Sequence, residues 1–181
     1  MKNLRDVILE KLSVNNISFD NLPDELKEKY NLILNPKTEK YDCDGDIKVK
    51  DDLIENGHFI CDFGIVKGSF NCSKCKKLES LKGAPVEVGK DFDCSGCKNL
   101  ESLQGAPEKV GRWFDCNGCE KLKTLEGAPK KVGRGFYCYE CSILESLKGA
   151  PEEVGGDFVC SSCPMLADYT IGTKIGGRLV K

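Results

Sequence analysis

Five pairs of cysteines, each separated by two residues, are the side chains in this sequence best suited to chemistry. The pairs are Cys72/Cys75, Cys94/Cys97, Cys116/Cys119, Cys138/Cys141 and Cys160/Cys163. CxxC pairs are typical of zinc sites and of thiol redox centres, and the spacing C-x2-C-x18-C-x2-C lies within the range of zinc-binding patterns. A structural interpretation is also open, because free cysteine behaves as a small buried apolar residue.

The cysteine pairs belong to a tandem repeat with a period of 22 residues. One unit reads F-x-C-x-x-C-x-x-L-x-x-L-x-G-A-P-x-x-V-G-x-x. A unit this short cannot bury its own apolar face, whereas stacked units can, so the sequence predicts a solenoid. The F-x-C segment alternates as a short strand does. We therefore expect Phe and Cys to point inward and the stacked strands to form a parallel sheet with a spacing of about 4.8 Å.

The repeat favours the structural interpretation of the cysteines. Five equivalent pairs cannot be divided into four-thiolate zinc sites without leaving one pair over. The pairs also lie among columns of Phe, Leu and Val, as core residues do. His58 is the only histidine and has no evident catalytic partner in the sequence. We therefore predict a buried cysteine ladder with reduced thiols, no metal, no cofactor and no catalytic residues. A zinc-stapled structural repeat protein is the alternative.

These residues resemble a known family of repeats. F-x-C-x-x-C-x-x-L is similar to the leucine-rich-repeat signature L-x-x-L-x-L-x-x-N/C-x-L, with Phe and Cys in the strand leucine positions. The continuation L-x-x-L-x-G-A-P-x-x-V resembles the short repeats of bacterial type III-secreted effectors and of phage proteins, and the resemblance covers residues 70–181. It implies an α+β repeat solenoid, a right-handed coil whose parallel sheet lines a concave, protein-binding face.

The ends of the chain differ from the repeats, and the sequence predicts one continuous domain in three parts. Residues 1–36 form an N-terminal helical cap, with apolar residues at helical spacing over 2–13 and a second helix that begins at Pro23 and runs through DELKEKY. Residues 37–69 form irregular β-coils, and residues 70–181 form the leucine-rich-repeat array. The terminal IGGRLVK predicts a last strand at Leu179–Lys181, whose open edge could pair with a second copy of the chain.

Composition narrows the function classes. The net charge is −2 with 31% charged residues, which gives no field that would attract nucleic acid or a membrane surface. No apolar run approaches the roughly 20 residues that span a bilayer. The N-terminus MKNLRDVILEKL has acidic residues among its apolar ones, unlike an export signal. We therefore expect a cytoplasmic protein, with export by a leaderless route left open.

The strand positions beside Phe and Cys vary while the core columns do not. The tryptophan and two tyrosines fall at these exposed positions, together with several aspartates. Tryptophan and tyrosine are enriched in binding hot spots, and an acidic surface favours a partner with a basic patch. We predict a non-enzymatic protein-binding module, a phage or bacterial effector or inhibitor, that acts as a monomer or as a homodimer through Leu179–Lys181. The predicted partner-binding residues are Asp91, Asp93, Trp113, Asp115, Asn117, Tyr137, Tyr139 and Asp157.

Overall fold

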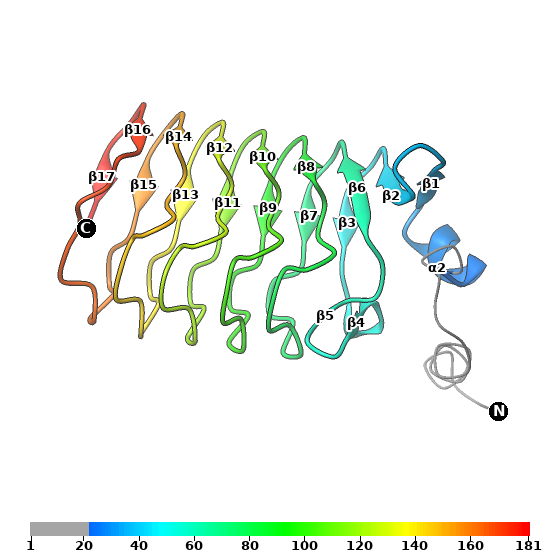
Figure 1. Ribbon diagram of the computed structural model, residues 1–181, viewed down its shortest axis with the longest axis horizontal. Helices are drawn as coiled ribbons and strands as arrows, with labels where there is room; N and C mark the ends of the chain where they lie inside the picture. The colour runs from blue at the N-terminus through cyan, green and yellow to red at the C-terminus, as the bar shows by residue number, and fades with distance from the viewer. Residues whose placement is uncertain (1–21) are drawn as a thin grey trace.

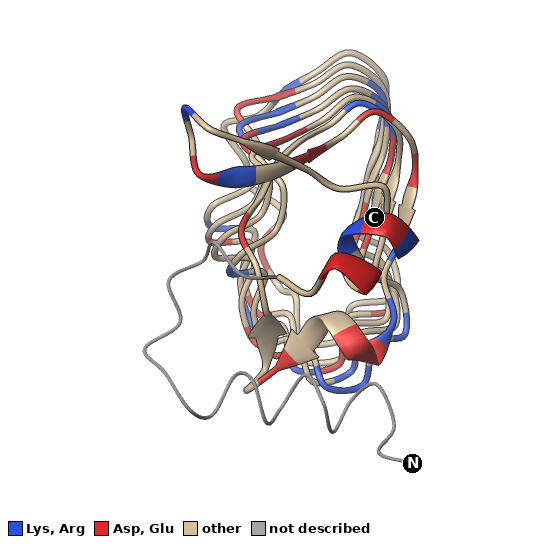
Figure 2. Cartoon of the chain, turned by 90° about the vertical axis from the view of Figure 1, so that its right-hand side faces the viewer, with Lys and Arg blue, Asp and Glu red and all other residues tan. Residues whose placement is uncertain are grey.

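The computed structural model describes residues 22–181, which wind into a stacked coil of about six turns with repeats of about 22 residues (Figure 1). Two sheets run along the stack, because each repeat contributes one two-residue strand to each of them. Viewed along the stack, the repeats superpose (Figure 2). The predicted solenoid of stacked parallel strands is confirmed.

The Phe-x-Cys segments form a seven-stranded parallel sheet. Its order is β17–β15–β13–β11–β9–β7–β3. Equivalent residues pair, so that Phe114 lies between Phe92 and Phe136. The predicted last strand is confirmed, since it pairs in register with β15. The strands are β3 (Ile47–Lys48), β7 (Phe70–Asn71), β9 (Phe92–Asp93), β11 (Phe114–Asp115), β13 (Phe136–Tyr137), β15 (Phe158–Val159) and β17 (Leu179–Val180).

The x-Val segments form a second sheet, of eight strands, which the sequence did not lead us to expect. Its order is β1–β2–β6–β8–β10–β12–β14–β16, with β1 antiparallel to β2 and the other pairs parallel. The turns from this sheet into the next Phe-x-Cys strand form the ridge along the upper edge of Figure 1. The strands are β1 (Ile33–Asn35), β2 (Lys40–Cys43), β6 (Phe63–Val66), β8 (Glu87–Val88), β10 (Lys109–Val110), β12 (Lys131–Val132), β14 (Glu153–Val154) and β16 (Lys174–Ile175).

A column of phenylalanines fills the core from coil to coil. The rings of the five repeat phenylalanines are fully buried and stack on one another. Centroid distances between successive rings are 5.5, 5.2, 5.2 and 4.9 Å along the stack. Because side chains alternate along a strand, slipping the register by one residue would expose each ring and bury the polar residue beside it. The phenylalanine column therefore fixes which side chains face solvent.

The CxxC segment is the corner at which each coil leaves the seven-stranded sheet. Its third residue has a positive φ in every repeat, 65° at Gly96 and 57° at Glu140, so the chain turns sharply between the two cysteines. The second cysteine then points into the core, where its thiol donates to the carbonyl of the first cysteine one coil earlier. This Sγ–O distance is 3.1 Å for Cys97, 3.4 Å for Cys119, 3.3 Å for Cys141 and 3.2 Å for Cys163. The cysteine ladder thus links adjacent coils.

The described N-terminal part contains one short helix, which packs against the core. Helix α2 (Asp24–Lys29) begins one residue after the predicted start at Pro23, ends one residue before Tyr30, and buries Leu26 against the core. Tyr30 donates to Asp52 at 2.8 Å, where a short 3-10 turn η2 (Asp51–Leu53) leads into the hairpin of β4 (Ile54–Glu55) and β5 (His58–Phe59). The predicted helix over residues 2–13 lies outside the described residues. Since residues 22–181 contain a single α-helix among short strands, the predicted α+β class and helical cap are not confirmed.

Candidate functional site

One groove crosses the seven-stranded sheet and has a volume of about 490 Å³. It extends over four neighbouring coils, from β7 to β13. Five of the eight predicted partner-binding residues line it: Asp91, Asp93, Trp113, Asp115 and Tyr137. We call it the Trp113 groove; its other lining residues are Ser69, Phe70, Asn71 and Phe92.

The strand alternation brings these side chains to the surface. Phe114 and Cys116 are fully buried, which leaves Asp115 between them on the outer face. The same alternation places Asp93 and Tyr137 outward on the flanking strands β9 and β13. The prediction that Phe and Cys point inward and the intervening residue outward is confirmed. The repeated residues therefore supply the scaffold, and the variable positions beside them supply the polar and aromatic side chains of the groove.

Trp113 is held in place by its neighbours on the ridge. Its side chain is 37% exposed, and the guanidinium of Arg112 lies 4.3 Å from its ring centroid. Arg134, one coil further on, lies at 5.7 Å. Asp91 contacts Arg112 Nε at 3.5 Å and accepts a hydrogen bond from the Trp113 backbone N–H at 3.3 Å. The indole is therefore presented on a fixed frame, which reduces the entropy lost when a ligand orders it.

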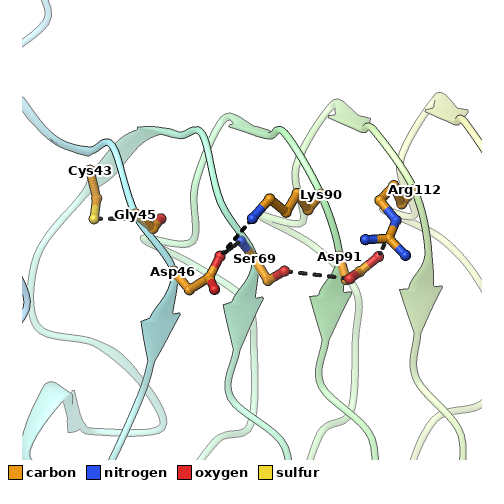
Figure 3. Close-up of polar contacts among 7 residues, drawn as sticks. All are labelled: Cys43, Gly45, Asp46, Ser69, Lys90, Asp91 and Arg112. Carbon is orange, nitrogen blue, oxygen red and sulfur yellow. Dashed lines mark hydrogen bonds and ion pairs between the residues drawn. The ribbon is translucent and has the colours of Figure 1, made fainter.

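Asp91 belongs to a row of polar contacts that runs along the ridge from coil to coil (Figure 3). Asp46 accepts from the Ser69 backbone N–H at 2.8 Å and lies 3.5 Å from Lys90 Nζ. Ser69 Oγ in turn donates to Asp91 at 3.4 Å. The predicted binding residue Asp91 thus has partners within the chain, and its contacts support Trp113.

Asp93 and Asp115 face each other on adjacent strands, in register. Asp93 accepts from Asn71 Nδ2 and from the Ser95 backbone N–H, at 2.8 and 2.9 Å. Asp115 accepts through Oδ1 from the backbone and side chain of Asn117, at 2.9 and 2.7 Å. Burial, together with the negative charge of Asp93, raises the pKa of Asp115 above its usual value. The two carboxylates therefore form an acidic centre in the groove.

Tyr137 closes one end of the groove because its neighbour is a glycine. In the column that places Trp113 in one coil, the next coil has Gly135, and a Cβ there would overlap the ring of Tyr137. The ring consequently covers Gly135, which is buried. An aromatic side chain thus lies one coil beyond Trp113 on the same sheet.

The three other predicted residues do not line the groove. Asn117 donates to the hydroxyl of Tyr139 at 3.0 Å, so these two form a pair beside Asp115. Burial raises the pKa of Tyr139, and Asp115 adds to that effect. Asp157 accepts from the Arg178 backbone N–H at 2.8 Å, and this bond lowers the pKa of Asp157. Asp157 therefore connects the last two coils.

Sequence reasoning did not identify Arg112, Arg134 or Gly135 as parts of the site. A signal was present, because VGRW and VGRG place the two arginines at the same repeat position on either side of Trp113. Their stacking on the indole depends on side-chain conformations that a repeat pattern does not specify. The role of Gly135 likewise follows only once the direction of the Tyr137 ring is known.

The second cysteine of four CxxC pairs donates its thiol hydrogen to a main-chain carbonyl of the preceding coil. All twelve cysteines are free and buried. Burial raises the pKa of Cys61 and of Cys75 to about 12, which favours the neutral thiol at these two positions. Within residues 22–181, no group of three or more His, Cys, Asp or Glu side chains is arranged to hold a metal ion. The residues present do not fit a structural zinc site.

Comparison of the chain with protein-family models, curated proteins and solved structures gave no match. In the described part of the chain, no helix has the length and apolar character needed to cross a membrane.

Proposed function

We propose that this protein is a non-enzymatic binding module that holds a partner protein in the Trp113 groove. The observation that carries the proposal is the position of four side chains around one groove of about 490 Å³, all at variable positions of the repeat: Trp113, Tyr137, Asp93 and Asp115. Tryptophan and tyrosine supply large contact areas at low entropic cost and are common in hot spots. A rigid solenoid presents such residues over several coils at once.

The charge of the groove favours a basic partner surface. Three aspartates line it and no lysine or arginine does. Acidic and basic residues are interspersed around the coils in the view down the stack (Figure 2), and the basic stripe of Lys90, Arg112 and Arg134 on the ridge is neutralised in part by Asp46 and Asp91. Nucleic-acid binding relies on such stripes to contact phosphates, so a protein partner is the better candidate.

Catalysis is not part of the proposal. His58, the only histidine of the chain, lies outside the groove and contacts the Asn56 carbonyl at 2.9 Å. The residues that line the groove include no histidine, cysteine or lysine. The zinc-stapled alternative is not favoured either, because in four successive coils the second thiol of the CxxC pair donates to a main-chain carbonyl.

The setting and the oligomeric state are further parts of the proposal. A role as a phage or bacterial effector or inhibitor rests on the resemblance to short leucine-rich repeats. A homodimer through Leu179–Lys181 rests on β17, which is an edge strand of the seven-stranded sheet in the described structure. Sedimentation over a range of protein concentrations distinguishes the dimer from a monomer.

A capture experiment with matched variants tests the binding proposal. The double variant Trp113→Ala, Tyr137→Ala removes both aromatic side chains from the groove. Met165→Ala is the control, since Met165 is a large apolar residue that is 56% exposed and lies outside the groove. We expect a specific protein to be retained by the wild type and the control and lost from the double variant. Equal retention by a folded double variant would reject the groove as the binding site.

A further inference from the structure

The acidic centre of the groove consists of two carboxylates that no lysine or arginine among the described residues neutralises. Asp93 and Asp115 are paired across β9 and β11, and like charges at such positions destabilise a sheet unless something compensates. Neither carboxylate has an ion pair with a lysine or arginine of residues 22–181, although Asp91 and Asp157 each contact an arginine. The repeat tolerates other residues at this position, since β7 has Asn71 and β15 has Val159. The two charges are therefore not a requirement of the fold.

One oxygen of the pair is left available. Asp115 Oδ1 accepts two hydrogen bonds from Asn117, whereas no hydrogen bond from the described residues reaches Oδ2. Asp93 uses each oxygen once, and each carboxylate oxygen can accept a second bond. The centre can therefore receive several N–H donors, over strands that lie about 4.8 Å apart.

The aromatic walls select for a flat cation. The ring of Trp113 already accepts the guanidinium of Arg112 at 4.3 Å, which shows that stacking of this kind is compatible with the site. Tyr137, on the strand next to Asp115, provides a second ring. A guanidinium has five donors in a planar fork and stacks on aromatic faces, while an ammonium is a compact and strongly hydrated charge.

We propose that the Trp113 groove receives an arginine side chain of the partner protein, whose guanidinium binds Asp93 and Asp115 and stacks against Tyr137. This inference rests on the proposed function and names the chemistry of its central contact. Two cations at the rim oppose an incoming arginine. Arg112 is compensated by Asp91, whereas Arg134 is exposed and lies over Trp113. Both arginines lie on the ridge, before strands β11 and β13 begin, so the incoming arginine reaches Asp93, Asp115 and Tyr137 from the side of the groove away from the ridge.

The single tryptophan makes the test direct. Titration of the whole protein with three tripeptides, Ac-Gly-Arg-Gly-NH2, Ac-Gly-Lys-Gly-NH2 and the neutral citrulline analogue, is followed by Trp113 fluorescence and by backbone amide shifts. We expect a dissociation constant on the order of 1 mM for the arginine peptide, as suits one side chain in an open groove. The lysine peptide should bind about five-fold more weakly, and the citrulline peptide should not bind detectably.

Variants link the response to the acidic centre. Asp93→Asn and Asp115→Asn should each weaken arginine binding about ten-fold, because each loses a charge-assisted contact. Asp157→Asn removes one charge outside the groove, at the repeat position that Asp91 occupies three coils earlier, and should bind as the wild type does. Circular dichroism of each variant confirms that the solenoid is intact.

The outcomes separate this inference from the proposed function. Equal binding of the arginine and lysine peptides, or arginine binding that survives both groove substitutions, would overturn the assignment of an arginine. No response to any of the peptides would also overturn it. The capture experiment with Trp113→Ala, Tyr137→Ala would still decide whether the groove binds a protein through other contacts.

Discussion

Replacing Gly133 with alanine should destabilise the protein strongly, although Gly133 lies at the surface. The glycine that follows each repeat valine forms a column along the ridge, and a Cβ at Gly133 would overlap the carbonyl oxygen of Gly111 in the preceding coil. The obstacle is backbone, which cannot move aside as a side chain can. A Cβ at Gly155 would likewise overlap the carbonyl oxygen of Gly133 in its own preceding coil. Close approach of adjacent coils therefore requires glycine here.

The cost can be estimated from the contacts that must shift. Forcing a methyl group into a packed position costs about 1–3 kcal/mol. Separating the coils also weakens the hydrogen bonds from Gly133 N–H to Val110 and from Gly155 N–H to Val132, both 2.9 Å, at about 1 kcal/mol each. The lower entropy of alanine in the unfolded chain offsets about 0.5 kcal/mol. We expect a net loss of about 3 kcal/mol, or a midpoint about 10 °C lower for a chain of this size.

Urea denaturation followed by circular dichroism measures this loss, and Gly172→Ala is the matched control. A Cβ at Gly172 meets nothing within 4 Å, so this substitution should leave the free energy of unfolding within about 0.5 kcal/mol of the wild-type value. If Gly133→Ala is as stable as Gly172→Ala, the close stacking of coils described above is wrong.

Three further predictions concern the turns, the groove and the thiols. Glu140→Gly should stabilise the protein by about 0.5 kcal/mol in urea denaturation, because Glu140 has a φ of 57° where two other repeats have glycine. Asp115→Asn should stabilise it by about 0.5 kcal/mol at neutral pH, since the folded state raises the pKa of Asp115 and so disfavours its charge. That gain should vanish below about pH 3.9, where the unfolded carboxyl is also protonated, and equal gains at both pH values would contradict it. Iodoacetamide should modify Cys163 before Cys75 in the native protein. The two thiols are 4% and 5% exposed, but a hydrogen bond from Cys141 lowers the pKa of Cys163 while burial raises that of Cys75. Peptide mapping by mass spectrometry gives the order.

The effect of Asp115→Asn also separates structure from function. A substitution that stabilises the fold while weakening partner binding identifies a residue kept for recognition, at the expense of stability. If Asp115 had only a structural role, replacing it would lower the free energy of unfolding of the protein. The same preparation therefore serves both measurements.

Much of the fold could be predicted from the repeat. The spacing of Phe92 and Cys94 specified a strand and its inward face, because alternation is a local property of the backbone, whereas the turn before Cys97 was not predicted. The second sheet was missed because a strand such as Lys109–Val110 is too short to show alternation. The α+β class came from the family resemblance, and the described chain has only α2 to support it.

The groove could be predicted only in part, for a related reason. Alternation identified which side chains face outward, and so found Trp113, Asp93, Asp115 and Tyr137. It could not show that Asp157 would be engaged by Arg178, because that contact depends on side-chain conformation. The unrepeated residues carry the specific chemistry, and a repeat pattern contains no information about their contacts.

Site-specific photocrosslinking tests the central claim most directly. A photoreactive phenylalanine analogue is placed at Tyr137 in the Trp113 groove or, as the comparison, at Ile65, which is 48% exposed on β6 of the other sheet. Cells that express each variant are irradiated, and the crosslinked products are identified by mass spectrometry. The account predicts one discrete protein adduct from position 137 and none from position 65. An adduct from position 65 with none from position 137 would contradict the claim that the groove is the binding face.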